Sequence, residues 1–211
     1  MLKISNMPDT TISPEEKIIA PMGQQPVRAR PVSWKTFEKK YLPREDRYKY
    51  EWVNGLVEKT ERDMNQYQTV IAARLLKLFF QLISKKKATG ILAIETDTFF
   101  LPKVHRRPDI CWFSDQQLSR MAAGENQVPR FVIEIISKND QIYQVNKKLR
   151  NYHDAGVEVV WLLFPLLEEV QVVHGNKITK HTGAQTISAA PVLPAFSLTV
   201  KEVFQKPVPE K

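Results

Sequence analysis

The sequence has little of the material from which several common kinds of functional site are built. Cysteine occurs once, at position 111, so no internal disulfide can form, as is usual in a reducing cytoplasm. The seven glycines supply no phosphate-binding loop, and the four histidines lack zinc-ligand spacing. No apolar run approaches the roughly 20 residues of a membrane-spanning helix, and residues 1–20 do not resemble a secretory signal. We therefore expect a cytoplasmic protein without a membrane partner.

Positive charge is in excess. Lys and Arg number 31 against 23 Asp and Glu, which gives a formal net charge of +8. Basic proteins of this size often bind polyanions, and nucleic acid is the first to consider. An ordinary basic surface would give the same total, so this alternative stays open. The basic residues form short groups such as Arg106–Arg107 and Lys147–Lys148, none of which is long enough to be a basic tail.

The order of predicted elements indicates an α/β fold. Residues 1–30, which contain four prolines, predict a flexible or loosely docked leader, and residues 31–207 predict a single domain. Helical patterns occupy residues 34–42, 65–84 and 141–155, and hairpin turns are expected at Asn54–Gly55 and Gly175–Asn176. Further strands are expected within residues 90–101, 109–113, 131–136 and 157–164. This order predicts a mixed β-sheet flanked by helices, with additional β-hairpins.

A charged residue interrupts the most apolar of these strands. Glu134 lies in the middle of the branched and aromatic run Phe131–Ile136, which is typical of a buried strand. An ionised group that is buried without a partner costs several kcal/mol or more. Side chains alternate along a strand, so Glu134 shares a face with Val132 and Ile136. A metal, a cation or a proton must therefore compensate Glu134.

One compensator is a metal shared with a second carboxylate. Asp109 follows Pro108 at the start of another predicted strand, and two carboxylates on neighbouring strands suit a hard divalent cation such as Mg²⁺. The backbone carbonyl of Ile135 would add a third oxygen. The other compensator is a lysine ammonium, which would form a buried ion pair. Cys111 lies inside a predicted strand and is interpreted as a core residue, not a nucleophile.

Several short motifs occur in an order that resembles a known family. The motifs are Tyr50–Gly55, Arg107–Ile110, Phe131–Ser137, Lys148–Tyr152, Ala155–Val157, Val160–Leu162 and Leu193–Leu198. Together they look like the Uma-type family, bacterial restriction-endonuclease-like proteins of the PD-(D/E)XK nuclease superfamily. The resemblance covers roughly residues 33 to 205, and it implies a restriction-endonuclease-like fold.

The resemblance also implies a set of site residues. Asp109 and Glu134 match the metal-binding and catalytic carboxylates. Ile136 stands where the superfamily has its strand lysine, and the family's lysine on the following helix matches Lys148. Glu51 matches an early family glutamate, and it is either a further acidic group of the site or an edge-strand surface carboxylate. Gln144 stands where many members have an aspartate.

Helical geometry distinguishes Lys148 from its neighbour. At about 100° per residue, Val145, Leu149 and Tyr152 form one apolar stripe. Lys148 lies roughly 65° from the centre of this stripe and Lys147 roughly 165° from it. Lys148 is therefore expected to reach inward and Lys147 to face solvent. The alternative is that both are ordinary surface lysines.

These residues predict metal-assisted hydrolysis of phosphodiester bonds in nucleic acid, with DNA as the expected substrate. Mg²⁺ or Mn²⁺ would activate water, and Lys148 would stabilise the phosphoryl oxygens. Arg106, Arg107 and Lys147 are predicted to contact flanking phosphates. The resemblance implies a homodimer, because cleavage of a duplex needs two sites. Two alternatives stay open: an inactive module of the same fold that binds nucleic acid or protein, and a structural subunit that meets an acidic protein.

Overall fold

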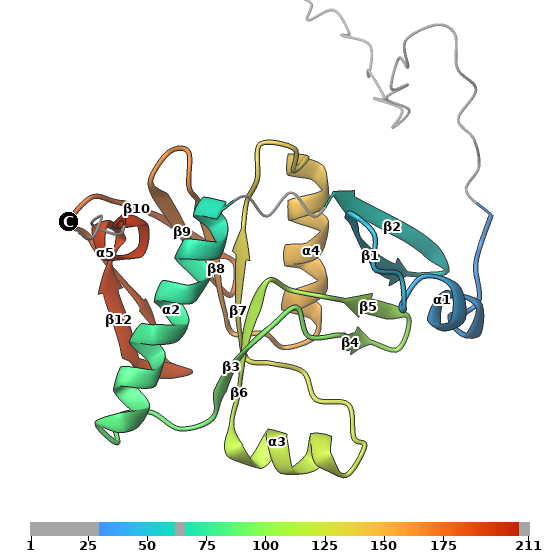
Figure 1. The fold of residues 1–211 in the computed structure, drawn as a ribbon, viewed down its shortest axis with the longest axis horizontal. Coiled ribbons are helices and arrows are strands. Elements are labelled where there is room, and N and C mark those ends of the chain that lie inside the picture. Colours follow the sequence, from blue (N-terminus) through green and yellow to red (C-terminus); the bar gives the residue numbers. More distant parts are fainter. Residues whose placement is uncertain (1–29, 62–65, 207–211) are drawn as a thin grey trace, which may run out of the picture.

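The computed structural model describes residues 30–61 and 66–206 (Figure 1). The predicted leader lies outside the described residues except for Arg30, and the domain bounds of 31–207 stay a prediction. The helices are α1 (Trp34–Lys40), α2 (Gln66–Ser84), α3 (Asp115–Ala122), α4 (Ile142–Asp154) and α5 (Val200–Phe204). The strands are β1 (Tyr48–Val53), β2 (Leu56–Glu61), β3 (Ile91–Ile94), β4 (Thr98–Leu101), β5 (Val104–Arg106), β6 (Ile110–Phe113), β7 (Phe131–Ile135), β8 (Val159–Phe164), β9 (Glu169–His174), β10 (Lys177–Thr182), β11 (Thr186–Ala189) and β12 (Leu193–Thr199).

The larger sheet is mixed. Its described strands follow the order β10-β9-β8-β7-β6-β3. β7 and β8 run parallel, with Glu134 opposite Leu162, whereas β6 and β9 flank them in antiparallel fashion. A parallel pair needs a crossover connection, and α4 supplies it. The carboxyl end of β7 therefore leads directly into the loop before α4. The charged side chains of the candidate site lie beside this end of the strand.

A smaller antiparallel sheet has the described order β2-β1-β5-β4. Its first hairpin turns at Asn54 and Gly55, whose φ angles are 52° and 83°. A two-residue hairpin turn with positive φ at both positions matches the twist of the strands, and Asn-Gly supplies it at low steric cost. The side chain of Ser33 caps α1 by accepting a hydrogen bond from the N–H of Thr36. α1 then packs Phe37 against the aromatic side chains of β1.

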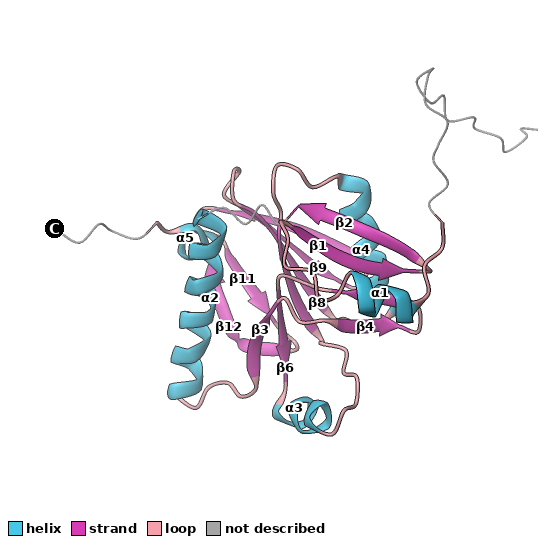
Figure 2. Cartoon of the chain, turned by 45° about the vertical axis from the view of Figure 1, so that its right-hand side comes forward, coloured by secondary structure: helices cyan, strands magenta, loops and turns pink. Residues whose placement is uncertain are grey.

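Both faces of the larger sheet are covered. Ile133 and Trp161 face one layer, which contains α2, α5 and the β11–β12 pair. Val132 and Leu162 face the other layer, which contains α4 and parts of the smaller sheet. Figure 2 shows α2 on one side and β1, β2 and α4 together on the opposite side. The alternation predicted around Glu134 is therefore confirmed, and its face is the one covered by α4 and the small sheet.

Most predicted elements are present, and the expected α/β fold is confirmed. The chain turns at Glu95, with φ 44°, so residues 91–94 and 98–101 belong to different sheets. Sequence analysis did not predict α3, β5 or β11. α3 buries none of its residues fully, and only Leu118 and Met121 pack against the core, so its apolar stripe is too short to detect. Its capping box, in which Ser114 and Gln117 each bond the other's backbone N–H, is the signal that could have revealed it.

Candidate active site

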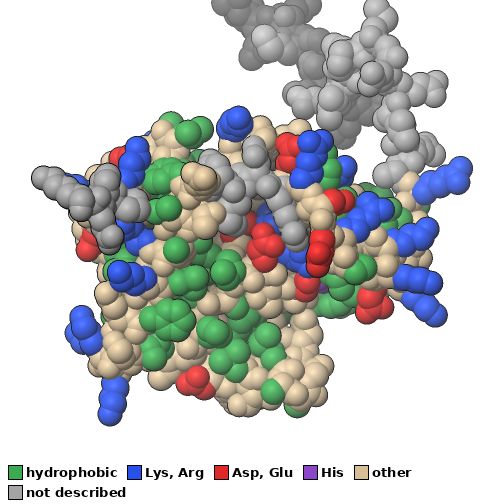
Figure 3. Space-filling view, viewed as in Figure 1, with side chains coloured by type: hydrophobic (Ala, Val, Ile, Leu, Met, Phe, Trp, Pro, Cys, Tyr) green, Lys and Arg blue, Asp and Glu red, His purple; other side chains and the backbone are tan. Residues whose placement is uncertain are grey.

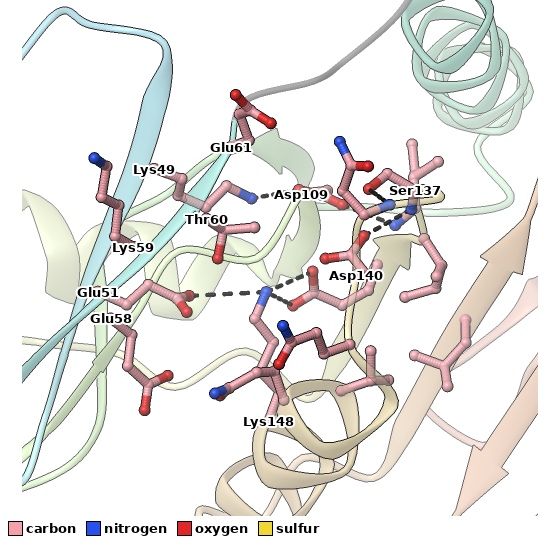
Figure 4. A pocket seen from close by; sticks show the side chains of 18 of the residues that line it. Lys49, Glu51, Glu58, Lys59, Thr60, Glu61, Asp109, Ser137, Asp140 and Lys148 are labelled. Atoms are coloured by element: carbon pink, nitrogen blue, oxygen red, sulfur yellow. Dashed lines mark hydrogen bonds and ion pairs between the residues drawn. The ribbon is translucent and has the colours of Figure 1, made fainter. Parts of the chain in front are cut away.

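A cavity of about 510 Å³ opens between the β1–β2 hairpin, the carboxyl end of β7 and α4. Its lining includes the acidic residues predicted for the site, Glu51, Asp109 and Glu134, and also Lys49 and Lys148. Figure 4 shows the side chains of Lys49, Glu51, Asp109 and Lys148 converging from different elements. β1 supplies Lys49 and Glu51, β7 supplies Glu134, and α4 supplies Lys148. Residues far apart in the sequence therefore meet in one cavity.

Glu134 is 4% exposed and is held by two donors from α4. The Nζ of Lys148 lies 3.2 and 3.1 Å from its two carboxylate oxygens, and the hydroxyl of Tyr152 donates to Oε1. Burial raises the pKa of Glu134, the ammonium of Lys148 opposes this, and the nearby Asp109 adds to it, so the pKa lies above its ordinary value. Glu134 therefore takes up a proton more readily than an ordinary glutamate does.

Asp109 precedes β6 and faces a different set of donors. Its Oδ1 accepts from the Nζ of Lys49, and its Oδ2 accepts from the backbone N–H of Ile135 at 2.8 Å. Burial pushes the pKa of Asp109 up, but Lys49 and Lys148 outweigh it and the pKa is lowered. The two neighbouring carboxyl groups therefore have pKa values moved in opposite directions.

Glu51 is 2% exposed and stays ionised. Its Oε2 accepts from Nη1 of Arg106 at 2.8 Å, and its Oε1 accepts from the backbone N–H of Arg107 at 2.8 Å. Lys148 lies 4.0 Å away. Burial alone would raise the pKa of Glu51, but Lys148, Arg106 and Lys49 lower it to about 2. Glu51 therefore faces the interior and is not a surface carboxylate of an edge strand.

Arg106 does not occupy the position predicted for a phosphate contact. Its side chain is 0% exposed and pairs with Glu51, Glu58 and Asn151. The prediction for Arg106 is wrong because successive residues of an extended chain point to opposite sides, so this arginine faces the interior. Its neighbour Arg107 pairs with Asp97 near the surface.

The expected orientation of Lys147 is also incorrect. Its Nζ pairs with the carboxylate of Glu58 on β2, and its side chain is 27% exposed. The helical angle indicated solvent, but it could not show that the β1–β2 hairpin lies over this part of α4. The roles of Arg107 and Lys147 toward nucleic acid stay predictions.

Lys49 is a cavity residue that the sequence analysis did not assign to the site. It is 8% exposed, and its ammonium pairs with Asp109. Burial lowers the pKa of Lys49, but the charge of Asp109 outweighs this and the pKa is raised, so the side chain stays cationic. Lys49 lies two residues before Glu51 in a strand, so the two side chains share a face. That spacing was the available signal.

The donor set suits a hard divalent cation. Asp109 and Glu134 offer carboxylate oxygens in one cavity, and Mg²⁺ is commonly held by one or two carboxylates together with waters and substrate phosphates. The carbonyl of Ile135, the predicted third ligand, accepts a hydrogen bond from Nε2 of Gln68 at 3.3 Å. No group of three or more His, Cys, Asp or Glu side chains in the described part of the chain has a metal-binding arrangement. The fit therefore rests on two carboxylates.

A family model described as "Putative restriction endonuclease", named Uma2, matches residues 34–201. The chain belongs to the Uma2 family. The fold of this Uma2 chain is also similar to the crystal structure of a putative nuclease belonging to DUF820 from Anabaena variabilis ATCC 29413. The two share 19% sequence identity with a TM-score of 0.68, over 82% of this chain and 98% of that chain. No curated protein matches the chain. The predicted family and the restriction-endonuclease-like fold are confirmed.

Three further features of this Uma2 chain concern its core, its surface and its helices. Cys111 is fully buried, and burial raises the pKa of its thiol to about 12, which fits the core role predicted for it. Figure 3 shows acidic and basic side chains side by side on the upper part of one face, with hydrophobic side chains gathered lower. None of the described helices is long and apolar enough to cross a membrane.

Proposed function

We propose that this Uma2 chain is a metal-dependent nuclease that hydrolyses phosphodiester bonds in nucleic acid. The observation that carries the proposal is the meeting of Asp109, Glu134 and Lys148 in one cavity. Two carboxylates beside a lysine can hold a divalent cation and stabilise the charge that develops on a phosphoryl group. Membership of a family described as restriction endonucleases supports the same reaction class.

The site residues would perform three different tasks in this proposal. Asp109 and Glu134 would hold Mg²⁺ or Mn²⁺, which when bound would lower the pKa of a water and polarise the phosphate. The pKa of Lys148 is raised, since Glu134 and Glu51 outweigh the effect of burial, so its ammonium persists to stabilise phosphoryl oxygens. Glu51 is a positioning residue that holds this ammonium from the side opposite Glu134.

The substrate and assembly follow from charge and from the reaction. We propose DNA as the substrate, because a net charge of +8 favours a polyanion. Arg107 and Lys147 would contact flanking phosphates, which gives affinity without sequence preference. A homodimer would supply the two sites that duplex cleavage requires, and we propose that the protein acts in the cytoplasm.

The test is cleavage of plasmid DNA by the purified full-length chain in Mg²⁺ or Mn²⁺. Asp109→Asn and Glu134→Gln should each reduce the rate by at least about 100-fold, the usual effect of losing a group that stabilises the transition state. Asp154→Asn, a change to an exposed carboxylate at the end of α4, should cleave like the wild type. Equal cleavage by all of these proteins would identify a contaminant and refute the proposal.

A second candidate is an inactive module of the same fold that binds nucleic acid. The observation in its favour is that Glu51, Glu58, Asp109 and Glu134 are already matched by buried or half-buried cations. Such a module would bind DNA at physiological salt but neither bind Mn²⁺ nor cleave. Calorimetric titration of the full-length chain with Mn²⁺ separates the two candidates, since only the nuclease requires the metal.

A further inference from the structure

Lys49 has no role in the proposed reaction, although it lies in the same cavity. It reaches from β1, across the space between the two sheets, to Asp109 at the start of β6 (Figure 4). The side chains of Lys49 and Asp109 are 10% and 13% exposed, so water screens this contact only weakly. A buried ammonium that touches a prospective metal ligand requires an explanation.

Four carboxylates of the site are each paired with a cation. These carboxylates are those of Glu51, Glu58, Asp109 and Glu134, and Glu61, Glu95 and Asp140 also line the cavity. The cations that pair with them are those of Lys49, Arg106, Lys147 and Lys148. A divalent cation bound to Asp109 would place two positive charges beside the ammonium that already pairs with this largely buried carboxylate, where the repulsion between like charges is strong. Metal binding at Asp109 therefore favours withdrawal of a cation from the site.

The contacts indicate which cation withdraws. Arg106 is fully buried, bonds three side chains and cannot lose its proton. Lys148 contacts both oxygens of Glu134 and approaches Glu51. Lys147 pairs with one oxygen of Glu58, which is not a proposed metal ligand, whereas Lys49 pairs with one oxygen of Asp109, which is. Its four-carbon stem is flexible, and the cavity of about 510 Å³ beside it leaves room for the ammonium to move.

We infer that Lys49 is a tethered cation that occupies Asp109 in place of a divalent metal, so that metal binding displaces it from this carboxylate. The inference rests on the proposed function, because it takes Asp109 as a metal ligand. When displaced, the ammonium stays inside the cavity, where a phosphate of the substrate brings negative charge. Lys49 thus couples occupancy by metal to the binding of substrate, and it is a positioning residue for Asp109 in the metal-free protein.

The test is the affinity of the full-length chain for Mn²⁺ alone, measured by calorimetry without nucleic acid. Lys49→Met removes the competing charge and should bind Mn²⁺ about tenfold more tightly, as expected when a close charge pair is broken. Lys59→Met is the matched control. Lys59 also lines the cavity, but its Nζ lies over the ring of Tyr48, 3.4 Å from the centroid. This control should change the affinity by no more than about twofold, because exposed charges are screened.

The outcomes separate the inference from the proposed function. Unchanged or weaker Mn²⁺ binding by a folded Lys49→Met variant, with binding by the wild type intact, overturns the inference alone. Absence of Mn²⁺ binding in both proteins overturns the proposed function as well. Binding by the variant but not by the wild type supports the inference, because Lys49 would then block the site.

A second variant covers the case in which Lys49→Met does not fold. Lys49→Arg keeps the positive charge and presents a forked guanidinium to Asp109. It should bind Mn²⁺ several-fold more weakly than the wild type. Equal or tighter binding by Lys49→Arg would show that the group at position 49 does not compete with the metal.

Discussion

Arg106 should be essential for stability, whereas its neighbour Arg107 should not. The guanidinium of Arg106 is fully buried and donates to Glu51, Glu58 and Asn151. Arg107 forms its ion pair with Asp97 nearer the surface, where the carboxylate is 35% exposed. Replacement of each arginine by methionine keeps similar length and removes the charge. Any difference between the two variants therefore reports the burial of the ion pair.

The magnitude follows from what each change leaves behind. Removal of one partner of a buried ion pair typically costs about 3–5 kcal/mol, because a buried charge loses its compensation. Glu58 keeps Lys147, and Glu51 keeps the N–H of Arg107, so the lower end of this range applies to Arg106→Met. The expected loss is about 3 kcal/mol, or roughly 6–12 °C in melting temperature for a chain of this size. Loss of a partly exposed pair, as in Arg107→Met, costs about 0–1 kcal/mol.

The free energy of unfolding of both variants would be measured by urea unfolding, followed by tryptophan fluorescence, in a buffer that contains a metal chelator. The double variant Arg106→Met with Glu51→Gln adds a stricter requirement. It removes both charges of the pair, so its loss of unfolding free energy should fall short of the sum of the single losses by at least about 1 kcal/mol. A loss below about 1 kcal/mol for Arg106→Met, or simple additivity in the double variant, would refute the conclusion that the buried ion pairs of Arg106 stabilise the fold.

Three other predictions concern stability. The pKa of Glu51 is about 2 in the folded protein, against an ordinary value of 4.5. Glu51 therefore contributes about 3 kcal/mol to the free energy of unfolding above pH 4.5, and this contribution is lost as the pH falls toward 2. Glu51→Gln should flatten the measured dependence of the free energy of unfolding on pH between these values. Gly90→Ala should cost about 2–3 kcal/mol in urea unfolding, because φ is +80° and a Cβ would lie 2.2 Å from the carbonyl oxygen of Phe113. Gly124→Ala, with similar φ and open space, should cost only about 1 kcal/mol, and equal losses would contradict the steric account. Tyr152→Phe removes the hydroxyl that donates to Glu134 and should lower the unfolding free energy by about 1.5–3 kcal/mol; no loss would show that this hydrogen bond is dispensable.

The sequence predicted the parts of the fold whose signals are local. The Asn54–Gly55 turn and the helical periodicity that gives α2 and α4 depend on neighbouring residues, and all three are present. The charge of Glu134 within an apolar strand is likewise a local signal, and it predicted that this residue is buried and compensated. Lys49 lies on β1 and Arg106 on β5, so their positions depend on how these two strands pair. In the structure Val53 of β1 lies opposite Val104 of β5. No local pattern specifies that register, so their buried partners could not be predicted.

The geometry of the site also depends on the side-chain contacts of Arg106. Lys49 and Glu51 come from the smaller sheet, whereas Glu134 and Lys148 come from the larger sheet and its helix. Arg106 on β5 bonds Glu51 on β1, Glu58 on β2 and Asn151 on α4, so one side chain ties the hairpin to the helix that carries Lys148. Lys148 lies on α4 and not on β7, and Ile136, directly after β7, packs against the core. A lysine on the same strand as Glu134 would be positioned by that strand, whereas a lysine on α4 is positioned only if the layers are held together.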